Sequence, residues 1–186
     1  MHIPLRQLFL AHVAQTSPAP LALEIERAEG IWLYGKEGQR WIDFISGISV
    51  SNVGHRHPHV LSAIQDQLNR YMHLMVYGEY VQSPQVKLAS ALAEVSEGLD
   101  CVYFVNSGTE ATEGAMKLAR RATGRKKLIS FRNAYHGSTM GSLSLMSEPM
   151  FTDPFKPLIP EVIHLESGDM NALDAIDTST AAVVFE

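Results

Sequence analysis

Hydrophobic and polar residues alternate along this chain with more than one period, and each period predicts a different element. Residues 4–15 place apolar side chains every three or four positions, which predicts a short amphipathic helix. Residues 21–44 instead alternate residue by residue, which predicts strands, with the GKEGQ stretch at 35–39 as a hairpin turn. A small antiparallel β unit is therefore expected after the first helix.

The apolar positions return to helical spacing further along the chain. Residues 60–72 carry an apolar residue at every third or fourth position and predict one helix. A second helix is expected to follow at once, with Ser83 as its N-cap, Pro84 at its first position and Gly98 closing it. This part of the chain therefore predicts two successive helices.

Short, continuous apolar runs alternate with helical segments after Cys101. Such runs predict buried strands, and they occupy residues 101–105, 127–131, 161–165 and 181–186. Strands that alternate with helices favour βαβ units, so we expect a mainly parallel sheet with helices on both faces. Cys101 opens the first run and is expected to be a buried structural thiol.

The change of pattern suggests two domains. Residues 1–58 are assigned to an N-terminal helix and a small-domain β segment, and residues 59–186 to the first part of a large α/β domain. The sequence stops on the apolar AAVVFE strand, and a strand of that kind needs a covering element. We therefore expect the large domain to be incomplete within these residues.

Composition narrows the classes of function. Apolar residues make up 46% of the 186 residues and charged residues 19%, which is typical of a globular protein. The net charge of −5 argues against nucleic-acid and anionic-membrane partners. The single Cys101 excludes an intramolecular disulfide framework and a multi-cysteine metal site, and no metal site is predicted. With neither a membrane-span pattern nor a signal-peptide pattern, a cytoplasmic location is expected.

The candidate chemistry begins where an apolar run meets a helix, at FVNSGTEATEG. Ligands of parallel sheets bind at the carboxyl ends of strands, and a helix N-terminus offers free amides and a partial positive charge. Gly108 allows an anion to approach the backbone, while Ser107 and Thr109 offer hydroxyl donors. A plain helix cap by Ser107 or Thr109 explains the same residues. The stretch matches neither the Walker A nor the G-x-G-x-x-G pattern.

A second turn follows the run at 127–131 and carries the sequence AYHG. Tyr135 and His136 would lie at the same edge of the sheet as the first turn, where an aromatic ring can stack on a flat ligand. Taken alone, such a string is common in surface loops. Taken together, an anion cradle and an aromatic platform suit a flat, phosphorylated cofactor.

These two turns, with two further stretches, resemble the class III, or ω-amino-acid, aminotransferases, which are pyridoxal-phosphate enzymes of fold type I. The matching stretches run nearly from end to end of the chain: GIWLYGKEGQRWIDFISGISVSNVGHRHPHV, VNSGTEATEGAMKLARRATGR, AYHG and AAVVFE. The resemblance implies the N-terminal part of that fold and pyridoxal 5′-phosphate as cofactor. It also implies a homodimer with shared active sites.

The resemblance assigns roles to five residues of the two turns. Gly108 and Thr109, together with Ser107, would donate hydrogen bonds to the cofactor phosphate. Tyr135 would stack on the pyridine ring, and His136 would shape the turn. All five are therefore predicted to bind the cofactor.

The resemblance also marks residues near the substrate. Glu186 matches the first glutamate of the family's E-P-x-x-G-x-G-G stretch and would support the pocket, and Ile48 lies in a segment that lines its entrance. Two positions depart from the ornithine and acetylornithine pattern, because Ser138 stands where those enzymes carry Arg, and Ile48 where ornithine-specific ones carry Tyr. A less specific amine or amino-acid donor is therefore the expectation.

The implied reaction moves an amino group from an amino-acid or ω-amine donor to a 2-oxo acid. The family's Schiff-base lysine lies downstream of the position of Glu186, so no catalytic lysine is expected in this chain, and residues 1–186 alone are expected to be inactive. Two alternatives stay open. One is a fold type I aminomutase of the glutamate-1-semialdehyde type, and the other is an inactive fragment that keeps the phosphate-binding turn.

Overall fold

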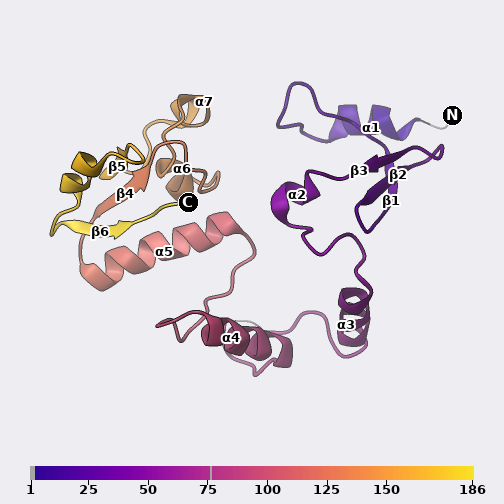
Figure 1. Ribbon diagram of the computed structural model, residues 1–186, viewed down its shortest axis with the longest axis horizontal. Coiled ribbons are helices and arrows are strands. Elements are labelled where there is room, and N and C mark those ends of the chain that lie inside the picture. The colour runs from indigo at the N-terminus through magenta and orange to yellow at the C-terminus, as the bar shows by residue number, and fades with distance from the viewer. Residues whose placement is uncertain (1–2, 76) are drawn as a thin grey trace. The chain divides into compact units, whose positions relative to one another are not determined.

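A computed structural model describes residues 3–75 and 77–186 (Figure 1). The chain forms two compact units, Met1–Val81 and Gln82–Glu186, and each is described here by itself. The observed division falls at residues 81 and 82. The predicted assignment of residues 1–58 and 59–186 to two domains stays a prediction.

The first unit contains the predicted helix and the predicted antiparallel sheet. Helix α1 (Leu5–His12) precedes strands β1 (Ile25–Glu29), β2 (Trp32–Gly35) and β3 (Arg40–Ile42), which pair in the order β1-β2-β3. Two arginine side chains pack on aromatic rings of β2: the guanidinium carbons of Arg27 and Arg40 lie 3.6 and 4.6 Å from the ring centroids of Tyr34 and Trp32. The predicted hairpin is confirmed between β2 and β3.

The short helix α2 (Ser46–Ser49) has an unusual backbone. Its four residues have φ angles of 49°, 62°, 61° and 63°, all in the left-handed region, although only Gly47 is a glycine. Each non-glycine residue in that region costs roughly 1–2 kcal/mol, so tertiary contacts must hold the turn. The Asp43 carboxylate holds the start of the turn locally, because its Oδ1 atom accepts hydrogen bonds from the Ile45 and Ser46 amides at 3.1 and 2.8 Å.

Asp43 is held in turn by His55, whose Nε2 atom lies 2.7 Å from Asp43 Oδ2. The His55 backbone is fixed by an isolated bridge to Gly30, with N···O distances of 3.0 and 2.7 Å. The Ser46 amide and then the His55 side chain lower the pKa of Asp43 below its ordinary value of 3.8. The folded state therefore binds the Asp43 proton less tightly than the unfolded chain does.

This difference predicts an acid-dependent stability. The contribution of Asp43 is complete above the unfolded pKa of 3.8, and it is lost as pH falls through the lower folded value. We expect Asp43→Asn to lower the free energy of unfolding at neutral pH, with a difference from wild type that shrinks below about pH 4. Urea titrations at several pH values measure it. Asp66→Asn, at an exposed aspartate of helix α3 (Pro58–Leu68), is the control, and an equal pH effect there would contradict the prediction.

The second unit begins with helix α4 (Ser83–Val95) and is built on a parallel sheet. Strand β4 (Lys127–Phe131) lies between β5 (Val162–Leu165) and β6 (Thr180–Val183), and both neighbours run parallel to it. The helical elements are α5 (Gly108–Thr123), α6 (Met140–Ser144), α7 (Pro149–Thr152) and the 3₁₀ helices η1 (Asp153–Phe155) and η2 (Met170–Ala175). Strands that alternate with helices confirm the predicted parallel α/β arrangement.

Helix α5 lies along β6 and α6 (Figure 1). Its buried Met116 meets Leu128 of β4 and Leu145, which follows α6, in the centre of the apolar core. The Ser130 side chain, fully buried in β4, donates a hydrogen bond to the Leu145 carbonyl at 2.6 Å. Strand β4, helix α5 and the residue after α6 therefore pack together in the core of the unit that carries the candidate site.

Three predictions about this unit are wrong. Residues 101–105 form no strand, because they pair with no other segment of the described residues, whose parallel sheet consists of β5, β4 and β6. Cys101 is consequently exposed rather than buried. Ser83 is the first residue of α4 rather than its N-cap, since Gln82 has the extended backbone angles of a cap, φ −104° and ψ 116°.

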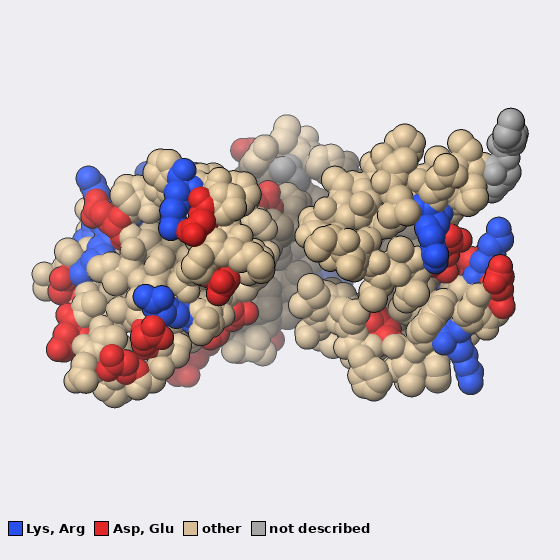
Figure 2. Space-filling model, turned by 90° about the horizontal axis from the view of Figure 1, so that it is seen from above, with Lys and Arg blue, Asp and Glu red and all other residues tan. Residues whose placement is uncertain are grey.

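Charged side chains of both signs lie next to each other on the face of each unit seen in Figure 2. Six ion pairs of the described residues join such neighbours, among them Arg132 Nε with Glu166 Oε1 at 2.7 Å. Within residues 3–75 and 77–186, every helix is too short or too polar to cross a bilayer. The same residues contain no cluster of three or more His, Cys, Asp or Glu side chains that could hold a metal ion.

Candidate active site

The first wall of the candidate site is the N-terminus of α5. Ser107 is the N-cap, with φ −150° and ψ 160°, and its Oγ atom accepts a hydrogen bond from the Glu110 amide at 3.3 Å. Glu110 Oε2 in turn accepts from the Asn106 amide at 2.8 Å and from the Ser107 hydroxyl at 3.2 Å. This reciprocal arrangement is close to a capping box, so the helix cap predicted as the simpler alternative is present.

The cap leaves two donors unused. Within the described part of the chain, the Gly108 and Thr109 amides have no hydrogen-bond acceptor. A Cβ atom built on Gly108 would meet no described atom within 4 Å, so the space above these amides is open. Two free amides at the positive end of a 16-residue helix are donors that an anion could use.

The Thr109 hydroxyl has a different role from the amides. Its Oγ1 atom lies 2.7 Å from Thr139 Oγ1 and donates to Ser142 Oγ at 3.0 Å. It also accepts from the Thr139 amide at 3.3 Å. The hydroxyls of Ser107 and Thr109 are therefore both used inside the protein, and the donors that face outward are backbone amides.

The second wall is the turn at Tyr135. The Tyr135 side chain and the α5 N-terminus line the same cavity. This cavity has a volume of about 430 Å³ and is lined by Gly108, Thr109, Thr112, Tyr135, His136, Gly137 and Ser138. The Tyr135 ring is 56% exposed and meets Phe151 edge to face, with ring centroids 6.3 Å apart. Its hydroxyl lies 3.3 Å from Ser138 Oγ. An exposed ring face beside an anion site is what a flat, phosphorylated ligand requires.

Glu186 and His136 complete this wall. Glu186 Oε2 accepts a hydrogen bond from the Tyr135 amide at 2.6 Å, so the carboxylate holds the backbone of the turn. His136 Nε2 is buried and has no hydrogen-bond partner among the described residues. Burial lowers the pKa of His136 below its ordinary value, and the Glu186 carboxylate partly opposes this effect. The imidazole is therefore neutral at neutral pH.

The structure thus brings together five of the predicted site residues, Gly108, Thr109, Tyr135, His136 and Ser138, around one cavity. Ser107 lies behind it as the cap, and Glu186 contacts it through the Tyr135 backbone. Ile48 belongs to the other unit, on the left-handed turn of α2, and its role stays a prediction.

Sequence reasoning missed several residues of the site. Thr112 lines the cavity one helical turn after Gly108, and its Oγ1 donates to the Gly108 carbonyl at 3.1 Å. The spacing of four residues along α5 was a usable signal for it. Glu113, Thr139 and Ser142 lie behind the cavity, and no local pattern marks them, because their partners are 26 to 33 residues away.

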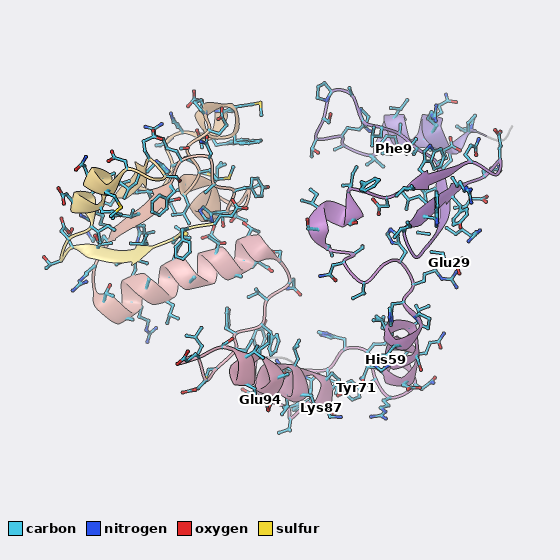
Figure 3. All side chains as sticks on the ribbon, in the orientation of Figure 1. Phe9, Glu29, His59, Tyr71, Lys87 and Glu94 are labelled. Atoms are coloured by element: carbon cyan, nitrogen blue, oxygen red, sulfur yellow. The ribbon has the colours of Figure 1, made fainter. Side chains whose placement is uncertain are left out.

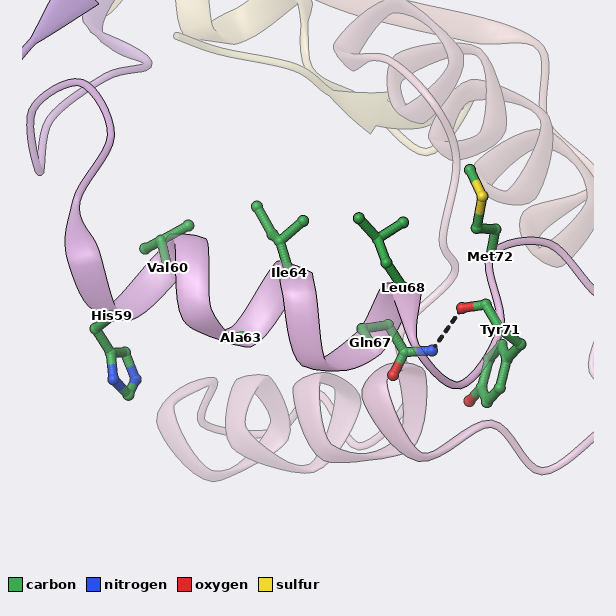
Figure 4. A pocket seen from close by; sticks show the side chains of 8 residues that line it. All are labelled: His59, Val60, Ala63, Ile64, Gln67, Leu68, Tyr71 and Met72. Carbon is green, nitrogen blue, oxygen red and sulfur yellow. Dashed lines mark hydrogen bonds between the residues drawn. The ribbon is translucent and has the colours of Figure 1, made fainter.

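A different kind of cavity lies along α3. Val60, Ile64 and Leu68 project from one side of this helix, and Met72 continues their row beyond its end (Figure 4). The cavity has a volume of about 500 Å³, and its polar contacts include a hydrogen bond from Gln67 Nε2 to the Tyr71 carbonyl at 2.9 Å. It is a row of apolar side chains without convergent polar groups, so it lacks the marks of a catalytic site.

The chain belongs to the class III aminotransferase family, whose sequence pattern it matches over residues 13–186. It is 40% identical to the acetylornithine aminotransferase of Archaeoglobus fulgidus over 176 residues, which are 94% of this chain and 46% of that protein. It is 45% identical to the acetylornithine aminotransferase of Methanopyrus kandleri over 160 residues, 85% of this chain and 41% of that one. The chain therefore spans less than half the length of these curated relatives.

Solved aminotransferases share the fold. The taurine:2-oxoglutarate aminotransferase of Bifidobacterium kashiwanohense, solved in complex with PLP and glutamate, superposes with a TM-score of 0.85 at 27% identity, over 96% of this chain and 46% of that one. An ornithine aminotransferase from Toxoplasma gondii gives a TM-score of 0.83 at 28% identity, over 96% and 43% of the two chains. The two units thus have the architecture of the N-terminal part of a fold type I aminotransferase.

Proposed function

We propose that this protein is a pyridoxal-phosphate-dependent aminotransferase that moves an amino group from an amino-acid or ω-amine donor to a 2-oxo acid. One observation carries the proposal: the free amides of Gly108 and Thr109 and the exposed Tyr135 ring line a single cavity. Because the chain spans less than half the length of its relatives, the activity is proposed for the whole protein, which we expect to work as a homodimer in the cytoplasm.

The residues present fit this cofactor. Two amides without acceptors at a helix N-terminus suit a phosphate group, and open space above Gly108 allows it to approach. The Tyr135 ring suits one face of a pyridine, and the buried His136 Nε2 is a polar atom that has no partner in the described chain. We assign the phosphate to Gly108 and Thr109, and the ring face to Tyr135.

When bound, the cofactor supplies an electron-withdrawing ring that makes bonds at the donor's reacting carbon easier to break. The residues of this chain bind and orient. The amides at 108 and 109 fix the anionic end, Tyr135 covers one ring face and keeps water from it, and Glu186 holds the Tyr135 backbone. We infer that the lysine that the family uses lies beyond residues 1–186, so these residues alone are expected to be inactive.

Ser138 bears on which amino-group donor the protein accepts as substrate. It lines the cavity next to the cofactor turn and stands where ornithine-type members of the family carry arginine. A serine hydroxyl offers a carboxylate one neutral hydrogen bond, whereas a guanidinium offers two charge-assisted ones. We therefore propose a broader donor range than acetylornithine, although the two curated relatives described above are acetylornithine aminotransferases by name. We propose Ile48 as a further substrate contact.

The proposal predicts binding and transfer by the full chain. We expect pyridoxal 5′-phosphate to bind much more tightly than pyridoxal, by roughly a hundredfold, because charge-assisted hydrogen bonds to the phosphate contribute about 1.5–3 kcal/mol each. Equilibrium dialysis measures this ratio. An amine panel with pyruvate or 2-oxoglutarate as acceptor should then show amino transfer, with N-acetylornithine among the donors tested. Equal affinity for the two cofactor forms, or no transfer to any acceptor, would contradict the proposal.

A further inference from the structure

Glu113 lies one turn further along α5 than the cavity, and it binds the start of α6. Its Oε1 atom accepts three hydrogen bonds: from Thr139 Oγ1 at 2.6 Å, from the Gly141 amide at 2.8 Å and from the Ser142 amide at 3.2 Å. The α6 N-cap, Thr139, forms no side-chain cap bond of its own within the described chain. A carboxylate from a neighbouring helix therefore caps α6, which is favourable at a helix N-terminus.

The contact is close as well as polar. A Cβ atom on Gly141 would clash with Glu113 Oε2, so a larger residue there would force the carboxylate away from the α6 backbone. Ser142 Oγ donates to the Thr109 carbonyl at 3.1 Å, and the Thr109 hydroxyl bonds to Thr139 and Ser142. Two successive turns of α5 are thus joined to the same four residues of the chain, 139–142.

Residues 139–142 follow the Tyr135 turn in the sequence. Thr109 and Glu113, which bind them, lie on the first two turns of α5, and the first of these turns carries the Gly108 and Thr109 amides. The ring platform and the amides are therefore held at a fixed separation by the bonds between α5 and α6. The Glu113 Oε1 atom makes three of these bonds, as many as the Thr109 Oγ1 atom, but Glu113 does not line the cavity itself.

We propose that Glu113 is a positioning residue that sets the distance between the phosphate amides and the ring-stacking tyrosine. The proposal rests on the proposed function of this cavity. It implies that loss of the Glu113 carboxylate shifts the Tyr135 wall while the Gly108 and Thr109 amides stay in place on α5. The ring end of the ligand should then lose affinity, and the phosphate end should keep it.

The test uses four versions of the full chain: wild type, Glu113→Ala, Glu113→Gln and the control Glu94→Ala. Glu94 is an exposed glutamate of α4, labelled in Figure 3, with no hydrogen bond or ion pair in the described chain. Dissociation constants are measured for pyridoxal 5′-phosphate and for inorganic phosphate, by quenching of intrinsic fluorescence and by competition. Thermal unfolding of every variant is followed in parallel.

We expect Glu113→Ala to weaken pyridoxal 5′-phosphate about tenfold, as loss of one to two hydrogen bonds predicts, and inorganic phosphate less than about twofold. Glu113→Gln keeps an acceptor oxygen and should stay within about threefold of wild type for both ligands. Glu94→Ala should match wild type. If Glu113→Ala does not fold, Thr139→Val removes one of the three bonds and should weaken pyridoxal 5′-phosphate selectively in the same way.

Two results would overturn the positioning role and nothing else. One is a wild-type affinity for pyridoxal 5′-phosphate in Glu113→Ala, and the other is an equal loss for both ligands, which a merely structural glutamate would cause. A wild-type chain that does not bind pyridoxal 5′-phosphate would instead overturn the proposed function, and the positioning role with it.

Discussion

Gly137→Ala is expected to destabilise the second unit by about 3 kcal/mol, which is the cost of overpacking a buried site. The same change is expected to abolish cofactor binding. Gly137 is buried at φ +125°, and a Cβ atom there would lie 2.4 Å from Thr109 Oγ1 and 2.6 Å from Thr109 Cβ. Neither Thr109 nor the turn can give way easily, because Thr109 Oγ1 is held by Thr139 and Ser142. Urea or thermal unfolding of the variant measures the loss.

Gly124→Ala separates the clash from the backbone strain. Gly124 ends α5 at φ +69°, and a Cβ atom there would meet nothing within 4 Å among the described residues. It should cost only about 1 kcal/mol, the ordinary penalty of a side chain in the left-handed region. If Gly137→Ala unfolds at the same denaturant concentration as Gly124→Ala, the close packing of the Tyr135 turn on Thr109 is wrong.

Tyr135→Ala should weaken pyridoxal 5′-phosphate about thirtyfold, through loss of the stacked ring area and of its face-to-face interaction. Tyr135→Phe should bind within about threefold of wild type, because the hydroxyl contributes only a 3.3 Å contact with Ser138. Spectroscopic titration of the full chain with the cofactor measures both. Stability should change little, since the ring is 56% exposed.

Tyr80→Ala is the matched control for this experiment. Tyr80 is also 56% exposed, lies in the first unit and does not line the cavity, so its loss should leave cofactor affinity at the wild-type value. If Tyr135→Ala binds the cofactor as tightly as wild type, the stacking role is wrong, and Tyr135 is an ordinary residue of a surface loop.

Local patterns predicted those parts of the fold that depend on neighbouring residues. Strands β4 and β5 follow from continuous apolar runs, and Ser107 caps α5 as one of the two predicted caps should. The expectation that Gly108 and Tyr135 lie close together is met, since both line one cavity, although the residues before Gly108 form no strand.

Features that depend on distant partners could not be predicted in this way. Residues 101–105 have the composition of a buried strand, but a strand also needs a partner strand, and no segment of the described residues pairs with them. The Thr109 hydroxyl has a suitable position for a phosphate, yet Thr139, 30 residues further along, takes it. The left-handed α2 turn likewise contains a single glycine, and Asp43 and His55 determine its shape from outside.

The cap of α5 also affects the rate at which the phosphate can bind. Ser107 and Glu110 satisfy the start of this helix without using the Gly108 and Thr109 amides, so the first turn needs no ligand in order to form. Such a turn is complete before the anion arrives, and its arrival requires no ordering of the backbone. Capture of the phosphate should therefore proceed at the rate of diffusive encounter, and amide hydrogen exchange in the first turn of α5 should be equally slow at Ala111 with and without it.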